Sequence, residues 1–94
     1  MTLPSAFYTA PIAHRGLHDL GAGRPENSPA AFEAAIRRGY GVELDVQLTR
    51  DGAAVVFHDY ALDRLTNEKG AVRLLDAVDL GRMTLKGGTD KIPT

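Results

Sequence analysis

The sequence predicts a single α/β domain, because three short apolar runs are arranged around one helix that lies between the first two. The runs cover residues 11–14, 42–48 and 54–57, and the helix covers residues 29–38. A helix between two strands is the connection that a parallel pair requires. The chain has 94 residues, which is enough for one small domain.

The first run, Pro11-Ile12-Ala13-His14, is typical of a buried strand, and it ends in His14-Arg15-Gly16. A glycine after a strand indicates a sharp turn or a close approach of the backbone to a ligand. The residues that follow, 17–27, are rich in glycine and predict a loop of the kind that often covers a site. His18 lies in this loop, and we expect it at the surface.

The predicted helix has recognisable signals at both ends. Ser28 is a favoured N-cap residue, and Pro29 fits the first helical position, where its missing N–H costs nothing. Gly39 is placed to end the helix in the left-handed conformation. Apolar residues recur along it at the spacing of one helical face, at Phe32, Ala35 and Ile36.

Apolar and polar residues alternate strictly between residues 42 and 48, which is typical of a strand with one apolar face. Glu43 and Asp45 fall on the same side of this strand, with their backbones roughly 6–7 Å apart. Two carboxylates that close repel each other, so a hard divalent cation between them would stabilise the pair. A polar strand edge facing solvent explains the same pattern equally well.

The third run follows the turn Arg50-Asp51-Gly52 and ends in His58-Asp59. So short a link favours an antiparallel hairpin between the second and third strands, taken in isolation. We interpret Asp51 as a turn residue. Beyond Asp59 the periodicity weakens, and only residues 74–81 suggest a short helical turn.

Composition excludes several classes of partner. The formal net charge is −1, so no basic field exists to gather nucleic acid. The absence of cysteine excludes disulfides and thiol chemistry and fits a reducing compartment. Residues 1–8 lack the pattern of a signal peptide, and no apolar run approaches the ~18 residues of a membrane span. We therefore expect a cytoplasmic protein.

Several short motifs occur in an order that resembles the N-terminal part of the glycerophosphodiester phosphodiesterase family. They are His14-Arg15-Gly16, Glu26-Asn27-Ser28, Glu43 with Asp45, Asp51-Gly52 and His58-Asp59. Arg64, Thr66 and Ile92-Pro93-Thr94 extend the resemblance over the chain from Ile12 to Thr94. It implies the N-terminal fragment of a (β/α)8 TIM barrel, with the second and third strands adjacent and the site at the C-terminal ends of the strands.

The resemblance also implies residue roles. His14 and His58 would be the acid/base pair, Arg15 a contact to the substrate phosphate, and Glu43 and Asp45 ligands to Ca²⁺ or Mg²⁺. Which imidazole acts as acid stays open. The supporting residues would be Glu26, Asn27 and Asp59, although a plain helix-cap hydrogen bond explains Glu26 and Asn27 equally well.

A barrel of this kind needs ~250 residues, and the family's third metal ligand, a later Glu, has no counterpart here. We therefore expect residues 1–94 to be a partial phosphodiesterase domain, weak or inactive alone, whose parent enzyme releases an alcohol and glycerol 3-phosphate in lipid metabolism. One alternative is a non-catalytic remnant that retains some cation binding; another is a related phosphodiesterase of phospholipid head groups. An open barrel leaves sheet edges unpaired and one sheet face uncovered, which invites self-association.

Overall fold

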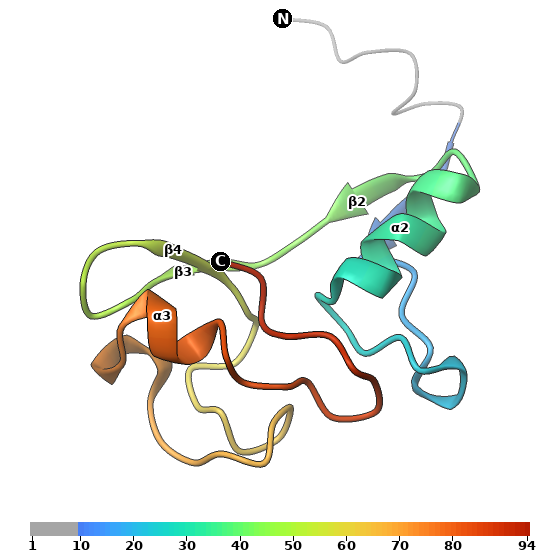
Figure 1. Ribbon diagram of the computed structural model, residues 1–94. Helices are drawn as coiled ribbons and strands as arrows, with labels where there is room; N and C mark the ends of the chain where they lie inside the picture. Colours follow the sequence, from blue (N-terminus) through green and yellow to red (C-terminus); the bar gives the residue numbers. More distant parts are fainter. Residues whose placement is uncertain (1–9) are drawn as a thin grey trace, which may run out of the picture.

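Two small sheets form the framework of residues 10–94, the part of the chain that the computed structural model describes (Figure 1). Strand β1 (Ile12–His14) pairs in parallel with β2 (Gly41–Glu43). Strand β3 (Val46–Leu48) pairs with β4 (Ala54–Val56) in the antiparallel direction. The expectation that the chain starts without a signal peptide falls on residues 1–8, which lie outside the described part.

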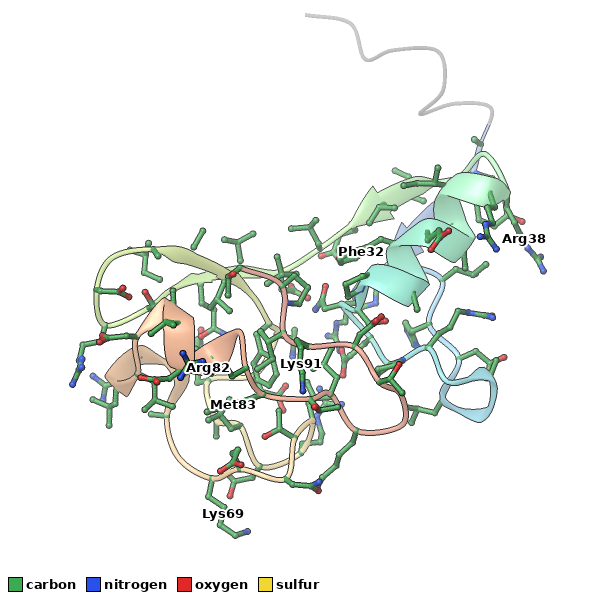
Figure 2. All side chains as sticks on the ribbon, in the orientation of Figure 1. Phe32, Arg38, Lys69, Arg82, Met83 and Lys91 are labelled. Atoms are coloured by element: carbon green, nitrogen blue, oxygen red, sulfur yellow. The ribbon has the colours of Figure 1, made fainter. Side chains whose placement is uncertain are left out.

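Helix α2 (Pro29–Arg37) connects the parallel pair, as predicted. The Ser28 hydroxyl accepts a hydrogen bond from the Ala31 N–H at 3.1 Å, and Gly39 ends the helix with φ 70°. The buried face differs from the predicted one: Ala31 and Ala35 are fully buried, whereas Ile36 is 67% exposed. The small side chains let α2 lie close to the strands. Arg38, at the end of α2, points away from the rest of the chain (Figure 2).

The prediction of one continuous strand over residues 42–48 is wrong. The strand is interrupted at Leu44 and Asp45, and its two parts belong to different sheets. At the interruption, the Asp45 N–H donates to the Asn27 side chain at 3.4 Å and the Asp45 carbonyl accepts from Phe57 N–H at 3.0 Å. The backbone thereby passes from the partner strand β1 to the partner strand β4.

The short link between β3 and β4 produces the antiparallel hairpin that its length favours. Val46 lies opposite Val56, and the turn contains Gly52 at φ 79°. The side chains of Val46 and Leu48 are 57% and 68% exposed. The expectation that a partial barrel leaves one sheet face uncovered is therefore confirmed for this hairpin.

The hydrophobic core lies in the C-terminal half of the chain. Its eight clustered residues, all beyond β3, are Val55, Phe57, Leu62, Leu65, Val72, Leu80, Leu85 and Ile92. This half also holds the 3-10 helix η2 (Val72–Leu74) and helix α3 (Ala77–Leu80), which confirms the predicted helical turn. In the N-terminal half, which includes the 3-10 helix η1 (Leu20–Ala22), the buried apolar side chains are small. Within residues 10–94, no helix has both the length and the apolarity needed to cross a bilayer.

Candidate functional site

The C-terminal end of β1 turns sharply through two residues with positive φ. Arg15 has φ 58° and Gly16 has φ 79°. For an arginine this left-handed conformation costs roughly 1–3 kcal/mol, and such strain persists only where the surroundings impose it. Here the Arg15 backbone N–H donates to Glu43 Oε1 at 3.1 Å. The turn therefore brings the backbone of Arg15 to the carboxylate at the end of β2.

The register of the parallel pair places His14 directly beside Glu43. The His14 Nε2 atom lies 3.8 Å from Glu43 Oε1, and the imidazole side chain is 66% exposed. The same oxygen thus faces both the ring of His14 and the backbone N–H of Arg15. Since carboxyl ends of parallel strands meet at one sheet edge, two of the predicted site residues are adjacent because of topology alone.

Asn27 connects Asp45 to the Arg15 turn. Its side chain is 1% exposed, and Nδ2 donates to Asp45 Oδ2 at 3.1 Å. Asn27 also has a left-handed backbone, φ 55°, and its N–H donates to the Arg15 carbonyl at 2.9 Å. The two strained residues therefore hold each other in place. The Arg15 Nε atom, 3.5 Å from Asp45 Oδ2, is buried without hydrogen-bond geometry to any described residue, so this contact is purely electrostatic.

Glu26 is a buried carboxylate that binds two guanidinium groups. Its Oε2 lies 2.6 Å from Arg15 Nη1, and its Oε1 lies 2.6 Å from Arg64 Nη2, with the Glu26 side chain only 8% exposed. Charge-assisted contacts of this kind are what a buried carboxylate requires. Neither Glu26 nor Asn27 caps α2, because Ser28 supplies that hydrogen bond. The helix-cap explanation for these two side chains is therefore wrong.

After β4, the motif His58-Asp59 forms its own cluster with Arg64. The His58 Nδ1 atom lies 2.7 Å from Asp59 Oδ1, a contact through which the carboxylate can orient this ring. Arg64 binds Asp59 through both Nε and Nη2, at 2.8 and 2.9 Å. The hydrogen bonds from Arg64 hold the pKa of Asp59 well below its usual range, against the opposing effect of burial, and those same contacts raise the pKa of Arg64. Asp59 is therefore ionised at neutral pH.

The structure thus joins the predicted residues into two groups. His14, Arg15, Glu43, Asp45 and Asn27 form one, and His58 with Asp59 forms the other. Arg64 and Glu26 connect them. Sequence reasoning noted Arg64 only as part of the family pattern and assigned it no role. Its position five residues after Asp59, suited to a local ion pair, was the available signal.

A small cavity of about 220 Å³ lies beside the connecting contacts, lined by Arg15, His18, Leu20, Glu26, Arg64 and Leu65. His18 is exposed at its rim, as expected for a surface loop residue. A larger open hollow of about 460 Å³, next to Asn67 and Arg82, contains none of the predicted site residues. Because the smaller cavity is the one lined by Arg15, Glu26 and Arg64, it belongs to the candidate site.

Two carboxylates suit a hard cation, but the set is incomplete. Among residues 10–94, no three His, Asp or Glu side chains gather closely enough to form a metal site by themselves. Glu43 Oε1 and Asp45 Oδ2 are engaged within the protein, whereas the second oxygen of each accepts no hydrogen bond from a described residue. Oxygen donors of this kind fit Ca²⁺ or Mg²⁺, with water completing the shell.

Comparison with known proteins agrees with the motif pattern. Residues 14–94 match the sequence profile of the "Glycerophosphoryl diester phosphodiesterase family". A glycerophosphodiester phosphodiesterase of Caldanaerobacter subterraneus is 52% identical over 66 residues, which are 69% of this chain and 26% of the relative. Glycerophosphodiester phosphodiesterase 1 of Rattus norvegicus is 39% identical over 93 residues, covering 88% of this chain and 27% of that protein. The chain spans about a quarter of the length of these curated relatives.

Solved structures show the same relationship in three dimensions. A phosphodiesterase of Oleispira antarctica, solved with the product sn-glycerol-3-phosphate, matches with a TM-score of 0.77 and 33% identity, over 95% of this chain and 38% of the other. A glycerophosphodiester phosphodiesterase of Agrobacterium tumefaciens matches with a TM-score of 0.76 and 31% identity, over 90% of this chain and 38% of the other. The fold is therefore that of a fragment of these TIM barrels.

Proposed function

This chain belongs to the glycerophosphoryl diester phosphodiesterase family, and we propose on that basis that it supplies part of an active site that hydrolyses glycerophosphodiesters to an alcohol and glycerol 3-phosphate. One observation carries the proposal. The ends of β1 and β2 bring the His14 ring and the Arg15 backbone to one Glu43 oxygen, at 3.8 and 3.1 Å. The Arg15 guanidinium lies 3.5 Å from the nearby Asp45 carboxylate. Imidazole, guanidinium and carboxylate groups are those that phosphodiester hydrolysis uses.

Arg15 is the proposed phosphate contact. Its Nη1 binds Glu26 and its Nε faces Asp45, so the contacts within the protein fix the direction of the guanidinium while leaving Nη2 without a hydrogen bond to a described residue. Fixed donors stabilise developing phosphoryl charge better than mobile ones, because they need no reorganisation during the reaction. The strained Arg15 backbone is consistent with such a constrained position.

Glu43 and Asp45 are the proposed ligands of Ca²⁺ or Mg²⁺ through their uncommitted oxygens. A bound cation would neutralise negative charge on the phosphoryl oxygens. Within the protein, Asn27 and the Arg15 backbone hold the other oxygen of each carboxylate. These hydrogen bonds orient the two groups before a cation binds, which is the usual role of contacts behind a metal ligand.

His14 and His58 are the proposed acid and base. One imidazole takes the proton of the attacking oxygen, from a substrate hydroxyl or a water, and the other gives a proton to the departing alkoxide. Imidazole suits both tasks because it titrates near neutral pH. Both rings are accessible, with 66% and 41% of their side chains exposed. No direct contact joins the two rings in the described part of the chain.

The test is a hydrolysis assay of the purified chain at high concentration, with glycerophosphocholine and Mg²⁺ or Ca²⁺, in which glycerol 3-phosphate is measured. We expect slow turnover that stops on chelation. His14→Ala and His58→Ala should each reduce it by the ~10²–10⁴-fold typical of losing an acid/base group. Arg38→Ala, at an exposed position beyond the site, is the control and should change nothing. Turnover that survives chelation, or equal turnover in the histidine variants, would contradict the proposal.

A further inference from the structure

Arg64 is the residue through which the two groups of site residues meet. Its guanidinium forms a two-pronged contact with Asp59, at 2.8 and 2.9 Å, and Nη2 also lies 2.6 Å from Glu26 Oε1. Glu26 binds Arg15 through its other oxygen. Arg64 follows β4, whereas Glu26 precedes α2, so one side chain ties together segments that are far apart in the sequence.

Arg64 is already committed to carboxylates. Two negative groups, Asp59 and Glu26, surround its single positive charge, and both Nε and Nη2 are occupied. Arg15 is also held by two carboxylates, Glu26 and Asp45. Arg64 differs because it contacts one carboxylate, Asp59, through two donors. Its planar, forked donors are suited to fixing the orientation of the Asp59 carboxylate. The geometry therefore favours a positioning residue over a binding one.

Asp59 in turn determines what the ring of His58 can do. An ionised carboxylate accepts hydrogen bonds and donates none. Asp59 Oδ1 lies 2.7 Å from His58 Nδ1. For that contact to be a hydrogen bond, the proton must be on Nδ1, which leaves Nε2 of the neutral ring as the proton acceptor. A free histidine side chain favours the opposite tautomer, with the proton on Nε2.

We propose that Arg64 is a positioning residue that holds Asp59 against His58, so that the neutral imidazole keeps its proton on Nδ1 and presents a basic Nε2. The importance of this tautomer for turnover rests on the proposed function. The tautomer itself does not depend on the proposed function, because it follows from the contacts of His58, Asp59 and Arg64 alone. Measuring the tautomer therefore separates this inference from the question of activity.

The experiment is nuclear magnetic resonance of the full 94-residue chain with isotope-labelled histidine, at alkaline pH where the rings are neutral. The imidazole ¹⁵N shifts distinguish the two tautomers. We expect His58 to be mainly the Nδ1–H form in the unmodified chain, and Arg64→Gln to lower the ratio of Nδ1–H to Nε2–H by about threefold or more, as expected from weakening one hydrogen bond. Arg73→Gln, at an exposed arginine of η2, is the matched control.

Thermal unfolding of the same variants shows whether Arg64 contributes only to the stability of the fold. A lower melting temperature with an unchanged His58 tautomer ratio would overturn the proposal, as would a mainly Nε2–H ring in the unmodified chain. If Arg64→Gln does not fold, Arg64→Lys replaces it, because lysine keeps the charge but not the fork. A lower ratio in Arg64→Lys supports the proposal, and an unchanged ratio overturns it. The exposed His18 ring serves as an internal reference in every spectrum.

Discussion

Gly16 offers the sharpest test of how the N-terminal half is built. It lies in the left-handed region with φ 79°, and an added Cβ would be 2.8 Å from the Ala31 Cβ and 2.9 Å from the Ala31 carbonyl carbon. Ala31 is fully buried in α2, so it has no room to move without shifting the helix. Gly16 therefore allows both the turn after β1 and the close approach of α2.

The magnitude for Gly16→Ala has two parts. A left-handed backbone costs an ordinary L-residue about 1–2 kcal/mol. Forcing extra atoms into a packed contact costs about 1–3 kcal/mol. We therefore expect the free energy of unfolding to fall by about 2–5 kcal/mol. Gly39 has a similar φ of 70° with nothing within 4 Å of its added Cβ, so Gly39→Ala should lose only the first part.

The assay is urea unfolding of the unmodified chain and the two variants, followed by circular dichroism. Gly16→Ala should be less stable than Gly39→Ala by about 1–3 kcal/mol, and each kcal/mol corresponds to a melting temperature lower by about 4–8 °C in a chain of this size. Equal losses in the two variants would refute the argument, because they would show that the contact with Ala31 costs nothing and that only backbone strain matters.

Four further predictions concern the site and its supports. Calorimetric titration should detect Mg²⁺ or Ca²⁺ binding, and Glu43→Gln and Asp45→Asn should each largely abolish it. The control Glu33→Gln, on the exposed side of α2, should retain binding. Unchanged binding in both site variants would refute the metal assignment. Because the pKa of Asp59 is lowered on folding, its contribution to stability is present above the unfolded pKa of about 3.9 and is lost as the pH falls toward the folded value. Urea midpoints measured from about pH 6 to about pH 2.5 should therefore decline less in Arg64→Gln than in the unmodified chain. Parallel declines in the two proteins would contradict this reasoning. Ser28→Ala removes the N-cap acceptor of α2 and should lower the free energy of unfolding by about 1 kcal/mol, whereas the exposed Thr89→Ala should change it little; equal urea midpoints would show that the cap is not needed. Finally, the chain alone should be a poor catalyst, because two carboxylates and an open site provide little preorganised stabilisation of phosphoryl charge. Rapid, chelator-sensitive turnover by the purified chain would refute this. It would show that the open site is sufficient or that copies of the chain associate to complete one another's sites.

Local chemistry accounts for much of what the sequence predicted correctly. The ends of α2 follow from Ser28, Pro29 and Gly39, whose preferences depend on their own backbone geometry. The β3–β4 hairpin agrees with the length of its link taken in isolation, whereas the resemblance to a barrel, whose strands run parallel, implied the other direction. The adjacency of His14 and Glu43 follows from parallel pairing through a helix. None of these needs knowledge of distant contacts.

The features that sequence reasoning missed all depend on long-range contacts. The interruption at Asp45 is made by Asn27, 18 residues earlier, and the periodic pattern of residues 42–48 carries no trace of it. Ile36 fits an apolar helical face, but in residues 10–94 no partner covers it. The contact of Arg64 with Asp59 is local, but its contact with Glu26 forms only when the fold brings the segment before α2 to the segment after β4. The metal ligands and the acid/base roles stay predictions.

The unequal division of the hydrophobic core has a consequence for how the chain opens. The large buried side chains lie beyond β3, whereas β1 and α2 bury mainly Ala13, Ala31 and Ala35. Segments with few apolar contacts exchange their amide hydrogens through partial unfolding, well below the cost of global unfolding. Hydrogen exchange should therefore divide the chain into two cooperative units, with α2 amides exchanging sooner than those of Leu62 and Val72. His14 and Arg15 would then leave the site in openings that keep His58 in folded surroundings.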